Sequence, residues 1–176
     1  SSITIRVKYL GGEGINPKTS GIKPIPPSFA KLYKSFIFNY QEVLNERYGG
    51  LETGQDLMLC IMPDSFVDTF IPYAEWKRKT GTQIHITKFS EINANANNPT
   101  AVKDHIQTAY GWENAPTHVL LIGDKGVAPI KYISYDWTFI HENYFVELEG
   151  NDFLPEMLIG RFTNQEIYRL QVMIAK

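Results

Sequence analysis

Cysteine is nearly absent from this sequence, since Cys60 is the only one among 176 residues. A single thiol excludes a disulfide framework within the chain, and it excludes a zinc centre built from several cysteines. The lack of disulfides does not fix the redox compartment, because large secreted domains can fold without them. Cys60 is also the only thiol that this chain could use as a nucleophile.

The sequence also lacks an excess of charge of one sign and any long apolar run. Its 17 Lys and Arg residues face 19 Asp and Glu residues, which gives a formal net charge of -2. We therefore expect binding neither to nucleic acid nor to a membrane. No run approaches the roughly 20 apolar residues of a transmembrane helix. The sequence does not open with a basic segment followed by an apolar stretch, so we predict no signal peptide in it.

The rest of the composition is that of an ordinary globular protein. Hydrophobic residues make up 43% of the chain and charged residues 20%. The length fits one domain with room for a short appended segment.

The first part of the chain differs in pattern from the remainder. Residues 3–10 alternate between apolar and polar side chains, which predicts a half-buried antiparallel strand. Residues 11–27 are rich in Gly and Pro and predict a loop. The spacing of apolar residues over 28–46 predicts one helix with Ser28 as its N-cap. Residues 47–56 contain three glycines and predict an exposed linker.

After the linker, strand and helix patterns alternate. Leu57–Met62 is a continuous apolar run, as in strands that are covered on both faces. Aromatic residues from Phe66 to Trp76 follow at helical spacing, and three basic residues before Gly81 predict the end of that helix. Gln83–Thr87 alternates again and predicts a second strand.

The second half of the chain continues the same alternation. We expect a helix over Thr100–Tyr110, with Thr100 as its N-cap, and a third buried strand at His118–Ile122. Tyr144–Leu148 and Met157–Ile159 are predicted as further short strands, and Gln165–Ala175 as the last helix. Strand–helix–strand repeats predict an α/β fold with a mainly parallel sheet and flanking helices.

The sequence contains the residue types used in nucleophilic and metal catalysis, but their positions do not indicate a catalytic or metal site. Cys60 lies in the middle of a predicted buried strand, where neither solvent nor a base would activate a thiol, so we interpret it as an inert core residue. None of the four histidines has a metal-ligand spacing. We interpret them as structural or surface residues: His85, His105, His118 and His141. No nucleophile-elbow, P-loop or dinucleotide motif is present.

The carboxylates are more informative. Asp124 follows a predicted buried strand, at the edge where parallel sheets carry their ligand sites. Asp152, Leu154 and Glu156 alternate, so in an extended chain two carboxylates share one side with a backbone carbonyl between them. Such mixed oxygen ligands suit Ca²⁺, although the spacing does not match an EF-hand. A solvated acidic loop is the alternative interpretation.

Three segments form a more specific combination. They are EWKRKTG at 75–81, PTHVLLIGD at 116–124, and EGNDFLPE at 149–156 followed by IGRF at 159–162. In this order and spacing they resemble the gingipain family of cysteine endopeptidases. The resemblance implies a caspase-like α/β domain of two subdomains, of which residues 48–176 match the first. It places the catalytic Cys and His in the second subdomain, beyond Lys176, so we expect no dyad in this chain.

The resemblance also implies features outside catalysis. Residues 1–47 resemble the tail of a propeptide, and Arg47 matches the position where such precursors are processed. Family members are secreted, so a secreted or cell-surface location is expected. The family further implies a structural calcium site. Its expected ligands are the side chains of Asp124, Asp152 and Glu156 and the backbone carbonyls of Glu149 and Leu154.

We therefore expect an N-terminal part of a secreted, calcium-stabilised cysteine endopeptidase that is inactive by itself. Its expected partners are the second catalytic subdomain and protein or peptide substrates. One alternative is a non-catalytic relative that serves as a scaffold for secretion or processing. A receiver-like or nucleotide-binding module is disfavoured, because Pro63-Asp64 at the end of the first buried strand gives one carboxylate and no glycine-rich loop.

Overall fold

The computed structural model describes residue 8 and residues 25–48, 55–134, 138–150 and 152–175. Apart from Lys8, the predicted strand at 3–10 lies outside these residues. So does the Gly- and Pro-rich segment up to residue 24.

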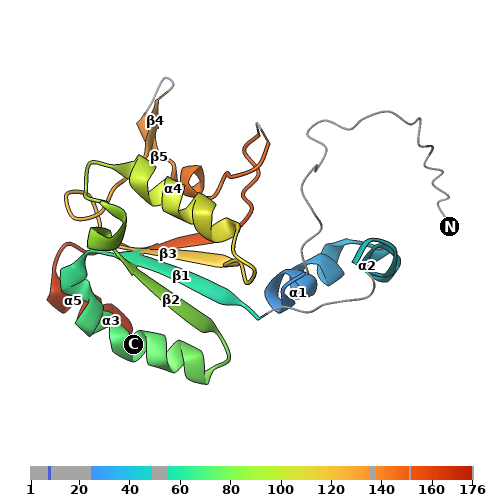
Figure 1. Ribbon diagram of the computed structural model, residues 1–176, viewed down its shortest axis with the longest axis horizontal. Helices are drawn as coiled ribbons and strands as arrows, with labels where there is room; N and C mark the ends of the chain where they lie inside the picture. Colours follow the sequence, from blue (N-terminus) through green and yellow to red (C-terminus); the bar gives the residue numbers. More distant parts are fainter. Residues whose placement is uncertain (1–7, 9–24, 49–54, 135–137, 151, 176) are drawn as a thin grey trace, which may run out of the picture.

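A four-stranded parallel sheet forms the centre of the chain (Figure 1). Its strand order is β2-β1-β3-β6. The strands are β1 (Leu57–Met62), β2 (Gln83–Lys88), β3 (His118–Ile122) and β6 (Leu158–Phe162). This confirms the predicted α/β class with a mainly parallel sheet, and β1 and β3 have the predicted bounds.

Helices cover both faces of the sheet (Figure 1). Helices α3 (Val67–Lys79) and α5 (Ile167–Ile174) lie on one face, and α4 (Pro99–Tyr110) lies on the other. Alternate residues of β1 supply the two cores, because successive side chains of a strand point to opposite faces. Cys60 and Met62 join the core under α3 and α5, whereas Leu59 and Ile61 join the core under α4.

The helix boundaries have local causes. Helix α3 ends before Gly81, which adopts a φ of 97° that suits glycine. Helix α4 begins with Asn98 as N-cap, whose side chain accepts a hydrogen bond from the backbone N of Ala101 at 3.2 Å. The prediction of Thr100 as N-cap is therefore wrong. Pro99 fits the first helical position because it has no N–H to satisfy, so the helix begins earlier.

The predicted strand at Tyr144–Leu148 is also wrong. The segment holds the end of a 3₁₀ helix, η3 (Glu142–Phe145), followed by a loop. Phe145 and Val146 are fully buried against α4, so their apolar pattern reflects core packing and not a strand. A short antiparallel hairpin of β4 (Tyr132–Ser134) and β5 (Thr138–Ile140) was not predicted.

Two further 3₁₀ helices follow the first two strands. They are η1 (Asp64–Phe66) after β1 and η2 (Phe89–Ile92) after β2.

Two helices replace the single helix predicted over residues 28–46. Helix α1 (Pro27–Phe36) and helix α2 (Tyr40–Tyr48) are separated at Ile37, whose backbone is extended. Both lie beyond the amino-terminal end of β1 (Figure 1). Ser28 is not the N-cap of α1, since Pro26 occupies that position.

Candidate functional site

Cys60 has the environment of a core residue. It is fully buried in β1, and burial raises the pKa of its thiol to about 12 against the opposing charges of Arg78 and Lys77. A thiol with such a pKa is almost entirely protonated at neutral pH, and only the thiolate is a nucleophile. The interpretation of Cys60 as an inert residue therefore agrees with the structure.

Two histidines pack around Trp112 near the end of α4. The ring of His85 lies 4.8 Å from that of Trp112, and the ring of His105 lies 6.1 Å from it. His105 Nε2 is 3.0 Å from Thr87 Oγ1. Burial lowers the pKa of His105, and the nearby His85 lowers it further against the charge of Glu91. These contacts are those of structural side chains.

The other two histidines also have close polar neighbours. His118 Nδ1 lies 2.7 Å from Thr117 Oγ1, and burial lowers the pKa of His118 despite the nearby charge of Asp56. His141 Nε2 lies 3.0 Å from Glu147 Oε1. Within the described residues, no three His, Cys, Asp or Glu side chains are grouped as a metal centre would require.

The carboxyl ends of β1 and β3 form the topological switch point of the sheet, where ligands of open α/β folds bind. Asp64 follows β1, and its carboxylate accepts hydrogen bonds from the backbone N and the hydroxyl of Ser90, which lower its pKa. Asp124 follows β3, and its Oδ1 accepts from the backbone N of Lys125 at 2.7 Å. Both carboxylates are thus engaged in holding the loops at this edge.

Gly123 makes the sharp turn before Asp124 possible. Its φ of 118° is one that side chains other than hydrogen rarely tolerate. A Cβ at this position would also lie 2.8 Å from Cβ of Ala128. The backbone path therefore requires a glycine at the end of β3, directly before Asp124.

Arg161 in β6 organises the same edge. Its guanidinium donates to both carboxylate oxygens of Glu142 at 2.7 and 2.9 Å, to the carbonyl of Gly123 at 2.9 Å and to that of Pro129 at 3.0 Å. The Arg161 side chain is only 5% exposed. Arg161 has no assigned role among the sequence-based predictions, and the predicted strand at Met157–Ile159 ends before it, whereas β6 continues to Phe162. The available signal is a charged side chain between Gly160 and Phe162, directly after an apolar run.

A buried amide lies beside this cluster. Asn164 follows β6 and is 2% exposed, and its backbone carbonyl accepts from the N of Asp124 at 2.8 Å. Its side-chain atoms meet no hydrogen-bond partner among the described residues. An unpaired buried amide costs stability, so a partner from outside this part of the chain would be favourable here.

The five residues predicted to bind calcium are not brought together. Strand β3 pairs with β6 in register from His118↔Leu158 to Ile122↔Phe162. Asp124 follows the carboxyl end of this pair, whereas Glu156 precedes its amino end. At about 3.3 Å per residue, at least ~13 Å of paired strand separates the two ends. The prediction that Asp124 shares a site with the 149–156 loop is therefore wrong.

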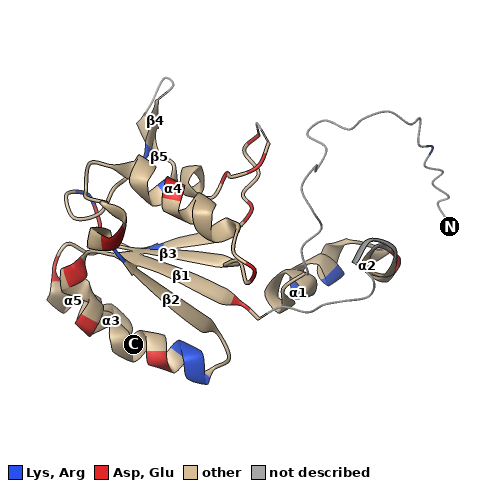
Figure 2. Cartoon of the chain, viewed as in Figure 1, with Lys and Arg blue, Asp and Glu red and all other residues tan. Residues whose placement is uncertain are grey.

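The remaining predicted ligands lie in one acidic loop before β6, on the side of the sheet toward α1 (Figure 2). Glu156 Oε2 accepts from the backbone N of Leu148 at 2.6 Å, and Asp152 Oδ1 accepts from the backbone N of Leu154 at 2.9 Å. Glu149 and Tyr110 share a hydrogen bond. Burial and then this bond raise the pKa of Tyr110, with a contribution from the charge of Glu156.

Arg47 lies in the last turn of α2 and not in an open linker. A protease cleaves an extended backbone, so cleavage there would require this turn to unwind. The sequence interpretation of residues 47–48 as linker is corrected accordingly. Residues 49–54 of the predicted linker lie outside the described residues.

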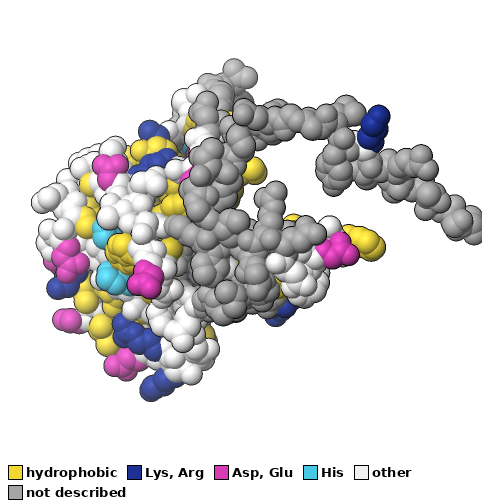
Figure 3. Space-filling view, turned by 45° about the vertical axis from the view of Figure 1, so that its right-hand side comes forward, with side chains coloured by type: hydrophobic (Ala, Val, Ile, Leu, Met, Phe, Trp, Pro, Cys, Tyr) yellow, Lys and Arg dark blue, Asp and Glu magenta, His cyan; other side chains and the backbone are white. Residues whose placement is uncertain are grey.

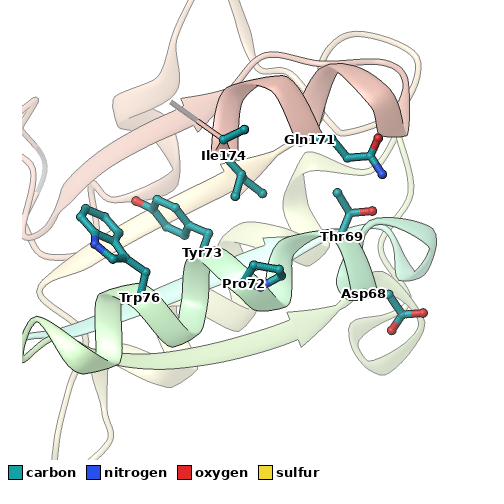
Figure 4. A pocket seen from close by; sticks show the side chains of 8 residues that line it. Asp68, Thr69, Pro72, Tyr73, Trp76, Gln171 and Ile174 are labelled. Atoms are coloured by element: carbon teal, nitrogen blue, oxygen red, sulfur yellow. The ribbon is translucent and has the colours of Figure 1, made fainter.

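A groove of about 700 Å³ runs along the contact between α3 and α5 (Figure 4). Tyr73 and Trp76 of α3 and Ile174 of α5 line it, with Asp68 as its acidic residue. This lining is mainly apolar and does not place a nucleophile beside a general base, so the groove is not a candidate catalytic centre.

On the face shown in Figure 3, acidic and basic side chains are interspersed. No described helix is long and apolar enough to cross a membrane.

Comparison with solved structures identifies relatives of the fold. The chain is similar to a structure called "Structure of Protease", with a TM-score of 0.61 and 22% identity over 68% of this chain. It is similar to the complex of the pro- and mature domains of Porphyromonas gingivalis RgpB, with a TM-score of 0.59 and 25% identity over 67%. The Arg-specific cysteine proteinase gingipain R gives a TM-score of 0.60 and 24% identity over 70%.

The chain spans 27%, 27% and 28% of the lengths of these three structures, respectively. No curated protein matches the sequence. The sequence profile of peptidase family C25 matches residues 52–176, which include the whole sheet and its helices. This chain therefore belongs to peptidase family C25, the gingipain family.

Proposed function

We propose that this chain is part of a gingipain-like cysteine endopeptidase and forms the first subdomain of its catalytic domain. The observation that carries the proposal is the match of residues 52–176 to a peptidase family. The reaction would use a thiolate that attacks the peptide carbonyl, with a histidine that carries the proton to the leaving amine. Residues 48–176 would form the subdomain, and residues 1–47 an N-terminal extension.

We further propose that the reactive Cys and His lie in polypeptide outside these 176 residues. Cys60 supports this proposal because it is the only thiol in the sequence and is fully buried. The unpaired amide of Asn164 supports a second subdomain that packs on the carboxyl edge of the sheet. In this view Arg161 keeps that edge rigid. A secreted or cell-surface location and peptide substrates belong to the same proposal.

We also propose that the loop before β6 binds calcium. Asp124 is excluded from it by the strand register. The loop offers Glu149 and Glu156 beside Tyr110, together with Asp152 and the carbonyl of Leu154. The described side chains do not form a ready metal centre, so binding would require the loop to rearrange. The role would be structural, and no catalytic step passes through the ion.

The proposal is tested by comparing this chain with the longer natural protein that contains it. The longer protein should hydrolyse peptides, lose activity on thiol alkylation and keep it in the Cys60→Ala variant. The 176-residue chain should be inactive. Absence of thiol-dependent hydrolysis in the longer protein would favour the non-catalytic scaffold. Activity of the 176-residue chain that depends on Cys60 would overturn the assignment of the nucleophile.

A further inference from the structure

The β4–β5 hairpin projects from the body of the fold beyond α4 (Figure 1), and both of its ends are fixed. Arg161 donates to the carbonyl of Pro129, shortly before β4, and to the carboxylate of Glu142, shortly after β5. The backbone N of His141 donates to the carbonyl of Lys131 at 2.8 Å and closes the base of the hairpin. The hairpin is therefore presented in a defined orientation on a rigid base.

Apolar side chains lie on both faces of the hairpin. Ile133 pairs with Phe139 on one face, and Tyr132 pairs with Ile140 on the other. Phe139 is 54% exposed and Ile140 57%. The two strands contain neither a charged residue nor a proline, which are the usual protection of an exposed edge. A ribbon of two strands is marginally stable in water, so the addition of further strands would stabilise it.

The free edge of β5 follows from the hydrogen-bond pattern of the hairpin. The bond from His141 to Lys131 marks a hydrogen-bonded pair, and such pairs alternate along an antiparallel ladder with pairs whose backbone groups point outward. Thr138 and Ile140 therefore direct their N–H and C=O groups away from β4. No other described backbone group bonds to them, and all three residues of β5 are exposed. The outer edge of β5 is thus open to a further strand.

We propose that this edge pairs with the same edge of a second copy of the chain, antiparallel and with a two-fold axis at Phe139. Thr138 and the partner's Ile140 then exchange hydrogen bonds, and so do Ile140 and the partner's Thr138, because these are the outward-pointing groups. Phe139 lies opposite the partner's Phe139. This inference does not depend on the proposed peptidase function, because it rests on the hairpin alone.

The side chains favour a second copy as the occupant. The two Phe139 rings meet as a non-hydrogen-bonded pair, in which side chains approach most closely, and Ile133 of each copy flanks them on the same face. Aromatic and β-branched neighbours are cross-strand pairs that stabilise sheets. A two-fold interface needs a self-complementary edge, which the pattern around Phe139 provides. The edge of β4 has the same pattern, but Ile133 at its centre is half-buried, so β5 is the more accessible edge.

A disulfide tests the pairing at Phe139. Opposite Cα atoms of a non-hydrogen-bonded pair are about 4.5 Å apart, a distance that a disulfide spans. Phe139→Cys should therefore give a covalent dimer of the full chain on mild oxidation, and Cys60 does not compete because it is buried. The control for random collision is Phe153→Cys, at a position that is 69% exposed. Equal cross-linking at the two positions would overturn the proposal.

A cysteine in β4 distinguishes the two edges of the hairpin. Ile133 lies on the same face as Phe139. In the proposed dimer three strand spacings, roughly 14 Å, separate the two copies of Ile133. Ile133→Cys should therefore cross-link no more than Phe153→Cys. Preferential cross-linking of Ile133→Cys would show pairing through β4 and would overturn the assignment of β5.

Sedimentation of the full chain tests the association without a covalent bond. The wild type should dimerise between roughly 10 µM and 1 mM, because an interface of this small size is weak. Phe139→Lys should weaken the dimer roughly fivefold or more, because it places like charges opposite each other. Phe153→Lys should leave the dimer unchanged. Thermal melts report whether each variant keeps its fold.

A mixture of two variants tests the two-fold axis. Phe139→Lys and Phe139→Glu should each be weakened alone and should associate when mixed, because opposite charges then face each other. Failure of the mixture to recover association would overturn the pairing at Phe139. A wild type that stays monomeric at the highest concentration would overturn the whole proposal and leave the edge to an extended segment of another protein.

Discussion

Arg161 and Glu142 form a bidentate ion pair, with Nε and Nη2 of the arginine 2.7 and 2.9 Å from the two carboxylate oxygens. The arginine is 5% exposed and the glutamate 30%. The same guanidinium also donates to the carbonyls of Gly123 and Pro129, so one side chain joins β6, the turn after β3 and η3. Glu142 thereby compensates the charge of a cation that the fold withdraws from water.

We predict that Arg161→Lys destabilises the protein by about 2 kcal/mol or more, because an ammonium cannot reproduce the fork geometry. Arg161→Ala should cost about 3–5 kcal/mol, the range for breaking a buried pair. Urea denaturation measures both. The control is Arg169→Ala, which removes an exposed pair with Glu166 at 3.7 Å and should change stability by less than ~1 kcal/mol. Equal effects at both arginines would contradict the role of Arg161.

The turn after β3 gives a second prediction. Gly123→Ala should lower the free energy of unfolding by about 1–3 kcal/mol, because of its positive φ and the contact with Ala128. Gly160→Ala in β6 is the matched control. A Cβ there meets its nearest neighbour, Cδ1 of Leu120, at 4.0 Å. Thermal melts of the two variants should therefore differ, and equal melting temperatures would refute the strain argument.

The sequence identifies the elements of the sheet well because their signals are local. Leu57–Met62 and His118–Ile122 are continuous apolar runs with clear ends, Pro63 in one case and Gly123 in the other. The apolar run near Phe145 misleads, since core packing against α4 produces the same composition without a strand.

The candidate site is less predictable because it depends on pairing over long sequence distances. Asp124 and Glu156 are separated by the register between β3 and β6, which no local pattern contains. The partners of Arg161 come from the turn after β3 and from η3, so the residue could be noticed in the sequence but its role could not be derived. Burial of Cys60, by contrast, follows from its place in an apolar strand and is predictable.

The pH dependence of stability gives a third prediction. The pKa values of His105 and His118 are lowered by burial, so the folded state takes up protons less readily than the unfolded state at these residues. Their contribution to the free energy of unfolding is therefore fully present above pH 6.5, the ordinary pKa of histidine. It is lost as the pH falls from there through the lowered pKa values of the folded state. The free energy of unfolding should decrease from pH 7 to pH 5.

Substitution separates the two histidines. His105→Gln keeps a polar partner for Thr87, 3.0 Å from the ring nitrogen, but removes the titrating group. Urea denaturation at several pH values should show a shallower dependence between pH 7 and 5 for this variant. Between pH 7.5 and 8.5 its dependence should equal that of the wild type. An unchanged slope at acid pH would show that His105 is not one of the responsible groups.

Calcium binding by the loop before β6 is tested by thermal melts of the chain in calcium and in chelator. A ligand that binds only the folded state raises its stability, by about 2.7 kcal/mol at a hundred times the dissociation constant. Glu156→Gln should remove the shift, because its carboxylate would be a ligand. Asp124→Asn should keep the shift, because Asp124 follows the opposite end of the paired strands. Equal melts of the wild type in calcium and chelator would eliminate the ion, and loss of the shift in Asp124→Asn would contradict the strand register.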